Sequence, residues 1–254
     1  NLYSVNRKAG IGAKIKKFLL KKANAYQITG SPQIEYIKFF YGQAVEKPFI
    51  KLPNLIDEEV YVDEVTELRS RKAELRSLFD VRETEQMWVL PARLISIKGI
   101  LPFITLLEGL KNIKLFILGD GELSEQVDRL IKEKSLPVVK VGFVQTSEVV
   151  KYYACADLSP IEALASNLPI LVSSRIGNSE DVLEPNINGW SYDPVTEKEK
   201  AKSIIFEISK LSRNELSVKG LESYRVYNEK FNTDLYINKY AKELKKIINE
   251  SITS

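Results

Sequence analysis

The sequence contains no histidine and only one cysteine, and these absences exclude several kinds of functional site. Histidine is the commonest protein ligand of zinc and the one side chain whose ordinary pKa lies near neutral pH, so neither a zinc site nor a histidine base is expected in these 254 residues. Cys155 has no partner for a disulfide within the chain. Because it lies in an apolar run, we predict a buried thiol that acts as a small hydrophobic side chain.

Long apolar runs and an excess of charge of one sign are also absent. The 37 basic and 34 acidic residues are interspersed and leave a net charge of +3, so no chain-wide field indicates a nucleic-acid partner. No apolar run approaches the roughly 18 residues that a membrane-spanning helix needs, and no signal-peptide pattern begins the chain. We therefore expect a cytoplasmic protein in which any anion site is local. An apolar content of 44% suffices for one large or two small cores.

From residue 85 to residue 194, apolar strands alternate with amphipathic helices, which predicts an α/β protein with a parallel sheet covered on both faces. The predicted strands are 87–92, 114–118, 138–141, 170–173 and 190–192, and the predicted helices are 101–110, 122–134 and 146–156. The first sixty residues predict a helix at 13–23, a strand at 25–29, a helix that begins at Ser31, and a strand at 48–52.

The alternation of strands and helices breaks after Asp157. A strand is expected there, yet the chain continues directly into Leu158-Ser159-Pro160, where a new helix is predicted to begin. A strand of about 5–6 residues and a loop of about 4–6 would restore the pattern. We therefore expect that a stretch of chain is missing between Asp157 and Leu158, and a genuine deletion is the alternative.

The segment PARLISIKG, from Pro91 to Gly99, places two cations after an apolar strand. Parallel strands deliver ligands at their carboxyl ends, and Gly99 permits a close approach of the backbone. Arg93 offers a planar fork and Lys98 a mobile point charge, so together they can neutralise a pyrophosphate. The alternative is a pair of solvated cations at the end of a strand.

A second candidate motif is LSPIEALASNLP, from Leu158 to Pro169. A predicted helix N-terminus offers free amides to phosphate, and the carboxylate of Glu162 can accept hydrogen bonds from both hydroxyls of a ribose. The alternative for Glu162 is a favourable interaction with the helix dipole.

Two glycine-containing turns carry weaker signals. Gly142-Phe143-Val144 ends the strand VVKVGF, and it is a candidate contact for a nucleobase only through the family resemblance given below, in which a similar turn offers backbone groups to the base. The turn GDGEL at Gly119 lacks the third glycine of a dinucleotide-binding fingerprint and places Asp120 where it would repel pyrophosphate, so NAD binding is not expected.

The motif that contains Arg93 and Lys98, together with the motif that contains Glu162, resembles the donor-nucleotide site of retaining GT-B glycosyltransferases of the glycogen-synthase-like family 4. The resemblance implies a donor domain with a Rossmann-like parallel sheet and a partial second Rossmann-like domain. It implies that Arg93 and Lys98 stabilise the departing nucleoside diphosphate without a metal, that Glu162 holds the ribose, and that the amides of Leu158 and Ser159 contact the diphosphate. The family's first glutamate and its glycine-aromatic-glycine neighbour have no counterpart.

The same resemblance divides the chain into four segments. Residues 1–56 correspond to the end of an N-terminal acceptor domain, 57–84 to an interdomain connection, 85–213 to the donor-binding domain, and 214–254 to helices that return toward the N-terminal domain. The expected substrates are a nucleotide sugar and a glycan or lipid-linked glycan acceptor, with no cofactor. A non-catalytic nucleotide-sugar-binding domain and a nucleotide-sugar epimerase are the alternatives.

The helix KIKKFLLKK, Lys14 to Lys22, carries lysines around an apolar stripe. Such a basic amphipathic helix is able to rest on anionic lipid at the inner face of a membrane. The alternative is an ordinary helix that packs its apolar stripe and solvates its lysines.

Overall fold

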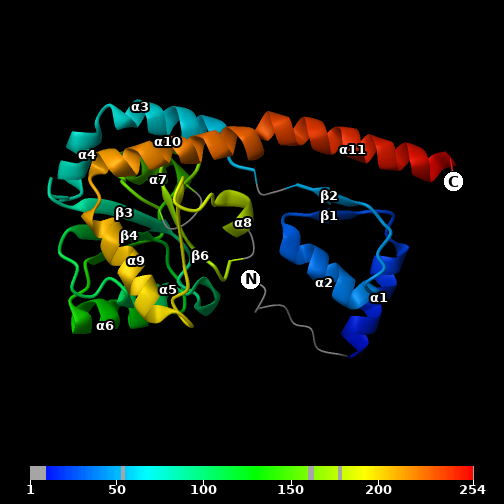
Figure 1. Ribbon diagram of the computed structural model, residues 1–254, viewed down its shortest axis with the longest axis horizontal. Helices are drawn as coiled ribbons and strands as arrows, with labels where there is room; N and C mark the ends of the chain where they lie inside the picture. Colours follow the sequence, from blue (N-terminus) through cyan, green and yellow to red (C-terminus); the bar gives the residue numbers. More distant parts are fainter. Residues whose placement is uncertain (1–9, 53–54, 160–162, 177–178, 254) are drawn as a thin grey trace. The chain divides into compact units, whose positions relative to one another are not determined.

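The computed structural model describes residues 10–52, 55–159, 163–176 and 179–253 of the chain (Figure 1). The chain divides into two compact units. The large unit comprises Asp57–Ser174 and Val182–Asn228, and the small unit comprises Asn1–Ile56, Arg175–Asp181 and Glu229–Ser254.

The large unit contains a parallel sheet. Strands β3 (Gln86–Pro91), β4 (Ile113–Leu118) and β5 (Val138–Gly142) pair in the order β3-β4-β5, and β6 (Ile170–Ser173) pairs with β7 (Gly189–Tyr192). Single parallel bridges link Leu158 to Trp88 of β3 and Ser159 to Ile170 of β6. These two residues therefore connect the two groups of strands.

Helices of the large unit cover both faces of this sheet (Figure 1). Their bounds are Val65–Arg69 (α3), Lys72–Leu78 (α4), Ile100–Thr105 (α5), Ser124–Lys134 (α6), Thr146–Cys155 (α7), Lys198–Lys210 (α9) and Arg213–Lys230 (α10), with a π-helix at Glu59–Glu64 (η1) and a single 3-10 turn at Ser96–Lys98 (η2). Alternate residues of β3 enter different cores, Trp88 and Leu90 on one face and Met87 and Val89 on the other. This alternation confirms the predicted sheet with two covered faces.

The small unit contains α1 (Ile11–Lys22), β1 (Tyr26–Ile28), α2 (Ser31–Tyr41), β2 (Phe49–Lys51) and α11 (Thr233–Thr253). Strands β1 and β2 are parallel, with Tyr26 opposite Phe49. The hydroxyl of Tyr240 in α11 donates a hydrogen bond to Oε1 of Gln27 in β1 at 2.9 Å. A short helix, α8 (Ser179–Val182), spans the boundary between the units.

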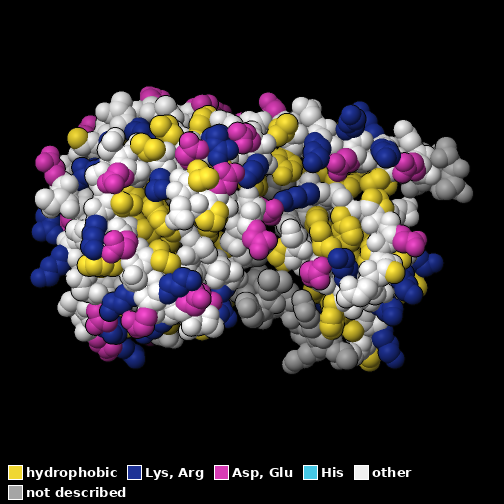
Figure 2. All heavy atoms as spheres, viewed as in Figure 1, with side chains coloured by type: hydrophobic (Ala, Val, Ile, Leu, Met, Phe, Trp, Pro, Cys, Tyr) yellow, Lys and Arg dark blue, Asp and Glu magenta, His cyan; other side chains and the backbone are white. Residues whose placement is uncertain are grey.

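The surface and the helices agree with the balanced composition. Figure 2 shows basic and acidic side chains interspersed over the visible face. Across the part of the chain that the structure describes, every helix is too short or too polar to cross a lipid bilayer.

Two sequence-based expectations about secondary structure are corrected. The predicted helix 101–110 ends at Thr105, after which turns bury Leu106 and Leu107 and close at Gly109, whose φ is +84°. No helix begins at Leu158, because Leu158 and Ser159 take part in the sheet instead. Both residues are fully buried. The strand at this place in the sheet is therefore two residues long, shorter than the strand of about 5–6 residues that the alternation predicts.

Candidate functional site

The loop that follows β3 presents the two predicted phosphate-binding cations. After β3 ends at Pro91, the chain runs through Arg93 to the 3-10 turn Ser96–Lys98, and α5 begins at Ile100. Gly99 joins the turn to α5 with φ +65° and ψ 28°, a left-handed conformation that glycine adopts at little cost. The loop therefore reverses direction within a few residues and keeps both cations at the carboxyl end of the strand.

The glycine turn after β4 holds this loop in place. The amide of Leu94 donates to the carbonyl of Asp120 at 3.0 Å, and the carbonyl of Leu94 accepts from the amide of Leu123 at 2.9 Å. A Cβ atom on Gly119 would lie 2.2 Å from the carbonyl oxygen of Ala92, and one on Gly121 would lie 2.6 Å from that of Leu94. Only glycine fits at both positions, so the turn has a packing role.

Asp120 is engaged by its own turn. Its carboxylate accepts hydrogen bonds from the hydroxyl of Ser124 at 2.5 Å and from the amide of Gly121 at 2.8 Å. These two hydrogen bonds hold the pKa of Asp120 below its usual value, and the hydrogen bond from Ser124 has the larger effect. The charged carboxylate therefore stabilises the start of α6.

Arg93 and Lys98 are both exposed, and neither side chain has a hydrogen-bond or ion-pair partner within the described ranges. Other cations of the large unit do have partners: Lys114 contacts Asp80 at 2.9 Å, and Lys140 contacts Asp128 at 2.5 Å. An anion that approaches the carboxyl end of β3 thus meets two positive charges that no described carboxylate compensates.

The turn after β5 lies at the same edge of the sheet. Gly142, with φ +90°, bridges Gly119, which itself contacts Ala92 of the Arg93 loop. Phe143 is 75% exposed, whereas Val144 is half-buried. Both border a hollow of about 370 Å³ lined also by Leu78, Phe79, Gln145, Glu148, Lys151 and Tyr152. The structure therefore brings the three turns together, and it directs Phe143 and Val144 toward α4 and α7.

The second motif is placed differently from the prediction. The amide of Ser159 donates to the carbonyl of Pro169 at 3.2 Å, and the carbonyl of Leu158 accepts from the amide of Val89 at 3.0 Å. These hydrogen bonds belong to the sheet, so the prediction that a helix begins at Leu158 and Ser159 is corrected, and the amide of Ser159 is not free as predicted. Glu162 lies outside the described residues.

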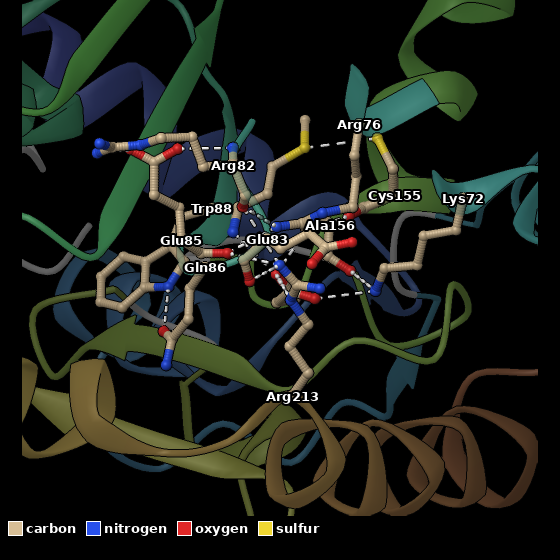
Figure 3. Close-up of polar contacts among 12 residues, drawn as sticks. Lys72, Arg76, Arg82, Glu83, Glu85, Gln86, Trp88, Cys155, Ala156 and Arg213 are labelled. Atoms are coloured by element: carbon tan, nitrogen blue, oxygen red, sulfur yellow. Dashed lines mark hydrogen bonds and ion pairs between the residues drawn. The ribbon is translucent and has the colours of Figure 1, made fainter. Parts of the chain in front are cut away.

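A buried charged network was not anticipated from the sequence. One oxygen of the Asp157 carboxylate accepts from Lys72 at 2.9 Å, and the other accepts from Arg76 and from the amide of Met87, both at 2.8 Å. Figure 3 shows the side chains of Lys72 and Arg76 from α4 and of Arg213 from α10 converging, and all three approach the carboxylate of Asp157. Since Arg76 and Asp157 are 81 positions apart, no local pattern signals the pair.

Within the described ranges, no group of three or more Asp, Glu, Cys or His side chains is arranged to hold a metal ion. The carboxylates next to the candidate site are instead engaged by neighbouring groups, as Asp120 is by Ser124.

Comparison with known proteins identifies the type of fold. The sequence model of a family described as "Glycosyl transferases group 1" matches residues 72–220. No curated protein matches the chain in sequence.

Several solved structures are similar to this one. Sucrose-phosphate synthase from Thermosynechococcus elongatus superposes with a TM-score of 0.77 at 15% identity, over 97% of this chain and 64% of that one. A glycosyltransferase from Rickettsia africae gives 0.76 at 16% identity, over 96% and 69%. Anabaena Alr3699/HepE in complex with UDP-glucose gives 0.73 at 16% identity, over 97% and 70%. The chain thus spans 64% of the length of the sucrose-phosphate synthase, and the likeness establishes the fold.

Proposed function

Because this chain belongs to the glycosyl transferases group 1 family and has the fold of GT-B glycosyltransferases, we propose that it moves a sugar from a nucleoside diphosphate sugar to an acceptor. The observation that carries the proposal is the pair of exposed cations, Arg93 and Lys98, at the carboxyl end of β3, which form no ion pair with any residue that the structure describes. In open parallel sheets, ligands bind outside the carboxyl ends of the strands, where the intervening loops meet.

The two cations have complementary tasks in this proposal. Arg93 binds two phosphate oxygens through its planar guanidinium, and the flexible side chain of Lys98 stabilises the negative charge that develops on the leaving diphosphate. Cleavage of the bond between the anomeric carbon and the phosphate oxygen leaves both electrons on that oxygen, and the cations stabilise the resulting charge. We propose that they take the place of a divalent cation and that the anomeric configuration is retained.

The remaining contacts of the donor are part of the same proposal. Backbone groups of Gly142, Phe143 and Val144 contact the nucleobase, Gly99 allows the diphosphate to approach the backbone, and Glu162 holds the ribose. Anabaena Alr3699/HepE was solved with UDP-glucose, which makes UDP the first nucleotide to test.

The proposed acceptor is a glycan or a lipid-linked glycan. Helix α1 supports a lipid-linked one, because its apolar side chains Ile11, Ile15, Phe18 and Leu19 are 54–80% exposed beside five lysines. A basic amphipathic helix of this kind binds anionic membrane surfaces. Sedimentation with phosphatidylglycerol vesicles, but not with phosphatidylcholine vesicles, tests this part separately.

Calorimetric titration with UDP tests the donor site. Arg93→Ala is expected to weaken UDP binding by about 2–5 kcal/mol, because it removes a partner of a desolvated phosphate. Arg129→Ala, which removes an exposed arginine from α6, is the matched control and is expected to bind as the parent does. Unchanged affinity in Arg93→Ala, together with a normal melting curve, contradicts the assignment.

Product analysis distinguishes the alternatives. A transferase releases UDP and forms a glycoside, an epimerase converts the donor into its epimer, and a binding module leaves the donor unchanged. Transfer that persists in excess EDTA supports the metal-free part of the proposal, and loss of transfer with EDTA that is restored by Mg²⁺ or Mn²⁺ contradicts it.

A further inference from the structure

A small cationic pocket lies in the large unit at the opposite ends of the strands from Arg93. Its volume is about 90 Å³, and it is lined by Arg69, Lys72, Ala156, Asp157, Asn167, Leu168, Pro169, Arg213, Ser217 and Leu221. Asp157 and Pro169 each directly precede residues that pair in the sheet. The volume exceeds several-fold the roughly 10–15 Å³ that one water molecule requires.

The lining of this pocket carries more positive than negative charge. Three cations, Arg69, Lys72 and Arg213, face one carboxylate, that of Asp157. This carboxylate is already compensated by Arg76 at 2.8 Å and Lys72 at 2.9 Å. Arg213 is farther away, with Nε 3.8 Å from the carboxylate.

The guanidinium groups of Arg69 and Arg213 donate hydrogen bonds to backbone carbonyls. A carbonyl is neutral, so it does not compensate the positive charge of either side chain. Arg69 donates to the carbonyl of Ser166, and Arg213 donates to the carbonyls of Glu83 and, at 3.1 Å, Glu85. Burial lowers the pKa of Arg69, and among the described residues no carboxylate pairs with it. A partly buried guanidinium without a counter-ion is costly, because charge is poorly solvated there.

Asn167 adds an unpartnered polar atom to the pocket. Its Oδ1 atom is inaccessible to solvent and lacks a hydrogen-bond partner within the described part of the chain. The turn that carries it is fixed against α10, because a Cβ atom on Gly220 would lie 2.1 Å from the carbonyl oxygen of Asn167. A ligand that provides both negative charge and an O–H donor would satisfy the arginines and this oxygen together.

We propose that this pocket binds a small phosphate-type oxyanion that also carries a hydroxyl donor, namely monohydrogen phosphate or a sugar phosphate. Its oxygens accept hydrogen bonds from Arg69, Lys72 and Arg213, and its hydroxyl donates to Oδ1 of Asn167 after the Asn167 side chain turns this buried atom toward the pocket that it lines. The site is independent of the donor site, since its lining excludes every residue of the Arg93 and glycine turns.

Thermal melting of the full chain with inorganic phosphate, at constant ionic strength set with chloride, tests the proposal. Phosphate is expected to raise the Tm in a saturable way, and titration with a hexose monophosphate shows which of the two sources binds more tightly. Arg69→Gln is expected to bind phosphate about tenfold more weakly, because one charge-assisted hydrogen bond is lost. Arg71→Gln, whose exposed side chain contacts Glu74, is the matched control and is expected to respond as the parent does.

Asn167→Asp keeps the shape of the side chain and adds a negative charge beside the cations. This variant is expected to melt at a higher temperature than the parent in phosphate-free buffer and to lose the response to phosphate. It keeps the proposal testable if Arg69→Gln does not fold. A full phosphate response in Asn167→Asp contradicts the proposal.

Arg93→Ala separates this pocket from the donor site. If phosphate binds the proposed pocket, the response persists in Arg93→Ala even though UDP binding is weakened. A phosphate response that disappears in Arg93→Ala assigns phosphate to the loop after β3 and overturns the proposal, and so does the absence of any saturable response in the parent protein.

Discussion

Arg76 donates a hydrogen bond to the carboxylate of Asp157 at 2.8 Å, with side-chain exposures of 6% and 1% respectively. The same guanidinium donates to the carbonyls of Cys155 at 3.1 Å and Glu85 at 2.6 Å, and the carboxylate also accepts from the amide of Met87 at 2.8 Å. One ion pair thus ties α4, the end of α7 and the start of β3 together (Figure 3).

We predict that Arg76→Leu lowers the free energy of unfolding by about 3–5 kcal/mol, because it leaves the buried Asp157 with less compensation. Urea denaturation followed by circular dichroism measures the change. Arg71→Leu, which breaks an exposed ion pair with Glu74, is expected to cost at most about 1 kcal/mol. Equal stability of the two variants would show that Lys72 suffices to compensate Asp157.

Gly220→Ala is predicted to destabilise the large unit by about 1–3 kcal/mol, although alanine is the better helix former. The new Cβ would lie 2.1 Å from the carbonyl oxygen of Asn167, so α10 must move away from the turn. Val218→Ala, at a 56% exposed position of the same helix, is the comparison and is expected to stay within about 0.5 kcal/mol. A stabilised Gly220→Ala variant would disprove the contact.

Burial raises the pKa of the Cys155 thiol to about 12. The folded pKa exceeds the unfolded value of 9.0, so this group's contribution to stability is fully present below pH 9 and is lost as the pH rises toward 12. At pH 8.5 we predict that iodoacetamide alkylates Cys155 only as fast as the protein unfolds. Rapid alkylation of the folded protein, measured by intact mass, would contradict this prediction.

Much of the large unit could be predicted because its pattern is local. The strand predicted at 87–92 is observed at Gln86–Pro91, and that at 170–173 is observed at Ile170–Ser173. Arg93 and Lys98 follow β3 as expected, since a strand and the turn after it are read from adjacent residues. Their identification as a phosphate site stays a prediction.

Features that depend on distant pairing could not be predicted. The strand at Leu158 and Ser159 is two bridged residues long, too short to show periodicity, and it forms only because β3 and β6 offer hydrogen bonds on either side. The pairing of Arg76 with Asp157 is invisible for the same reason. The glycines of GDGEL were recognised as a turn, but the sequence does not show that their missing side chains leave room for Ala92 and Leu94.

This close approach leads to a prediction that connects packing to the proposed donor site. In Gly121→Ala, the added Cβ would lie 2.6 Å from the carbonyl oxygen of Leu94, so the loop that carries Arg93 must shift while the core beneath it is unchanged. We expect UDP binding about tenfold weaker with the fold retained, because displacement of a positioned charge costs on the order of 1.4 kcal/mol or more. Gly109→Ala is the control: φ is +84° there and a Cβ meets no atom within 4 Å, so it strains the backbone without moving the loop. If calorimetry shows that both variants bind UDP as the parent does, the position of the Arg93 loop does not determine nucleotide affinity.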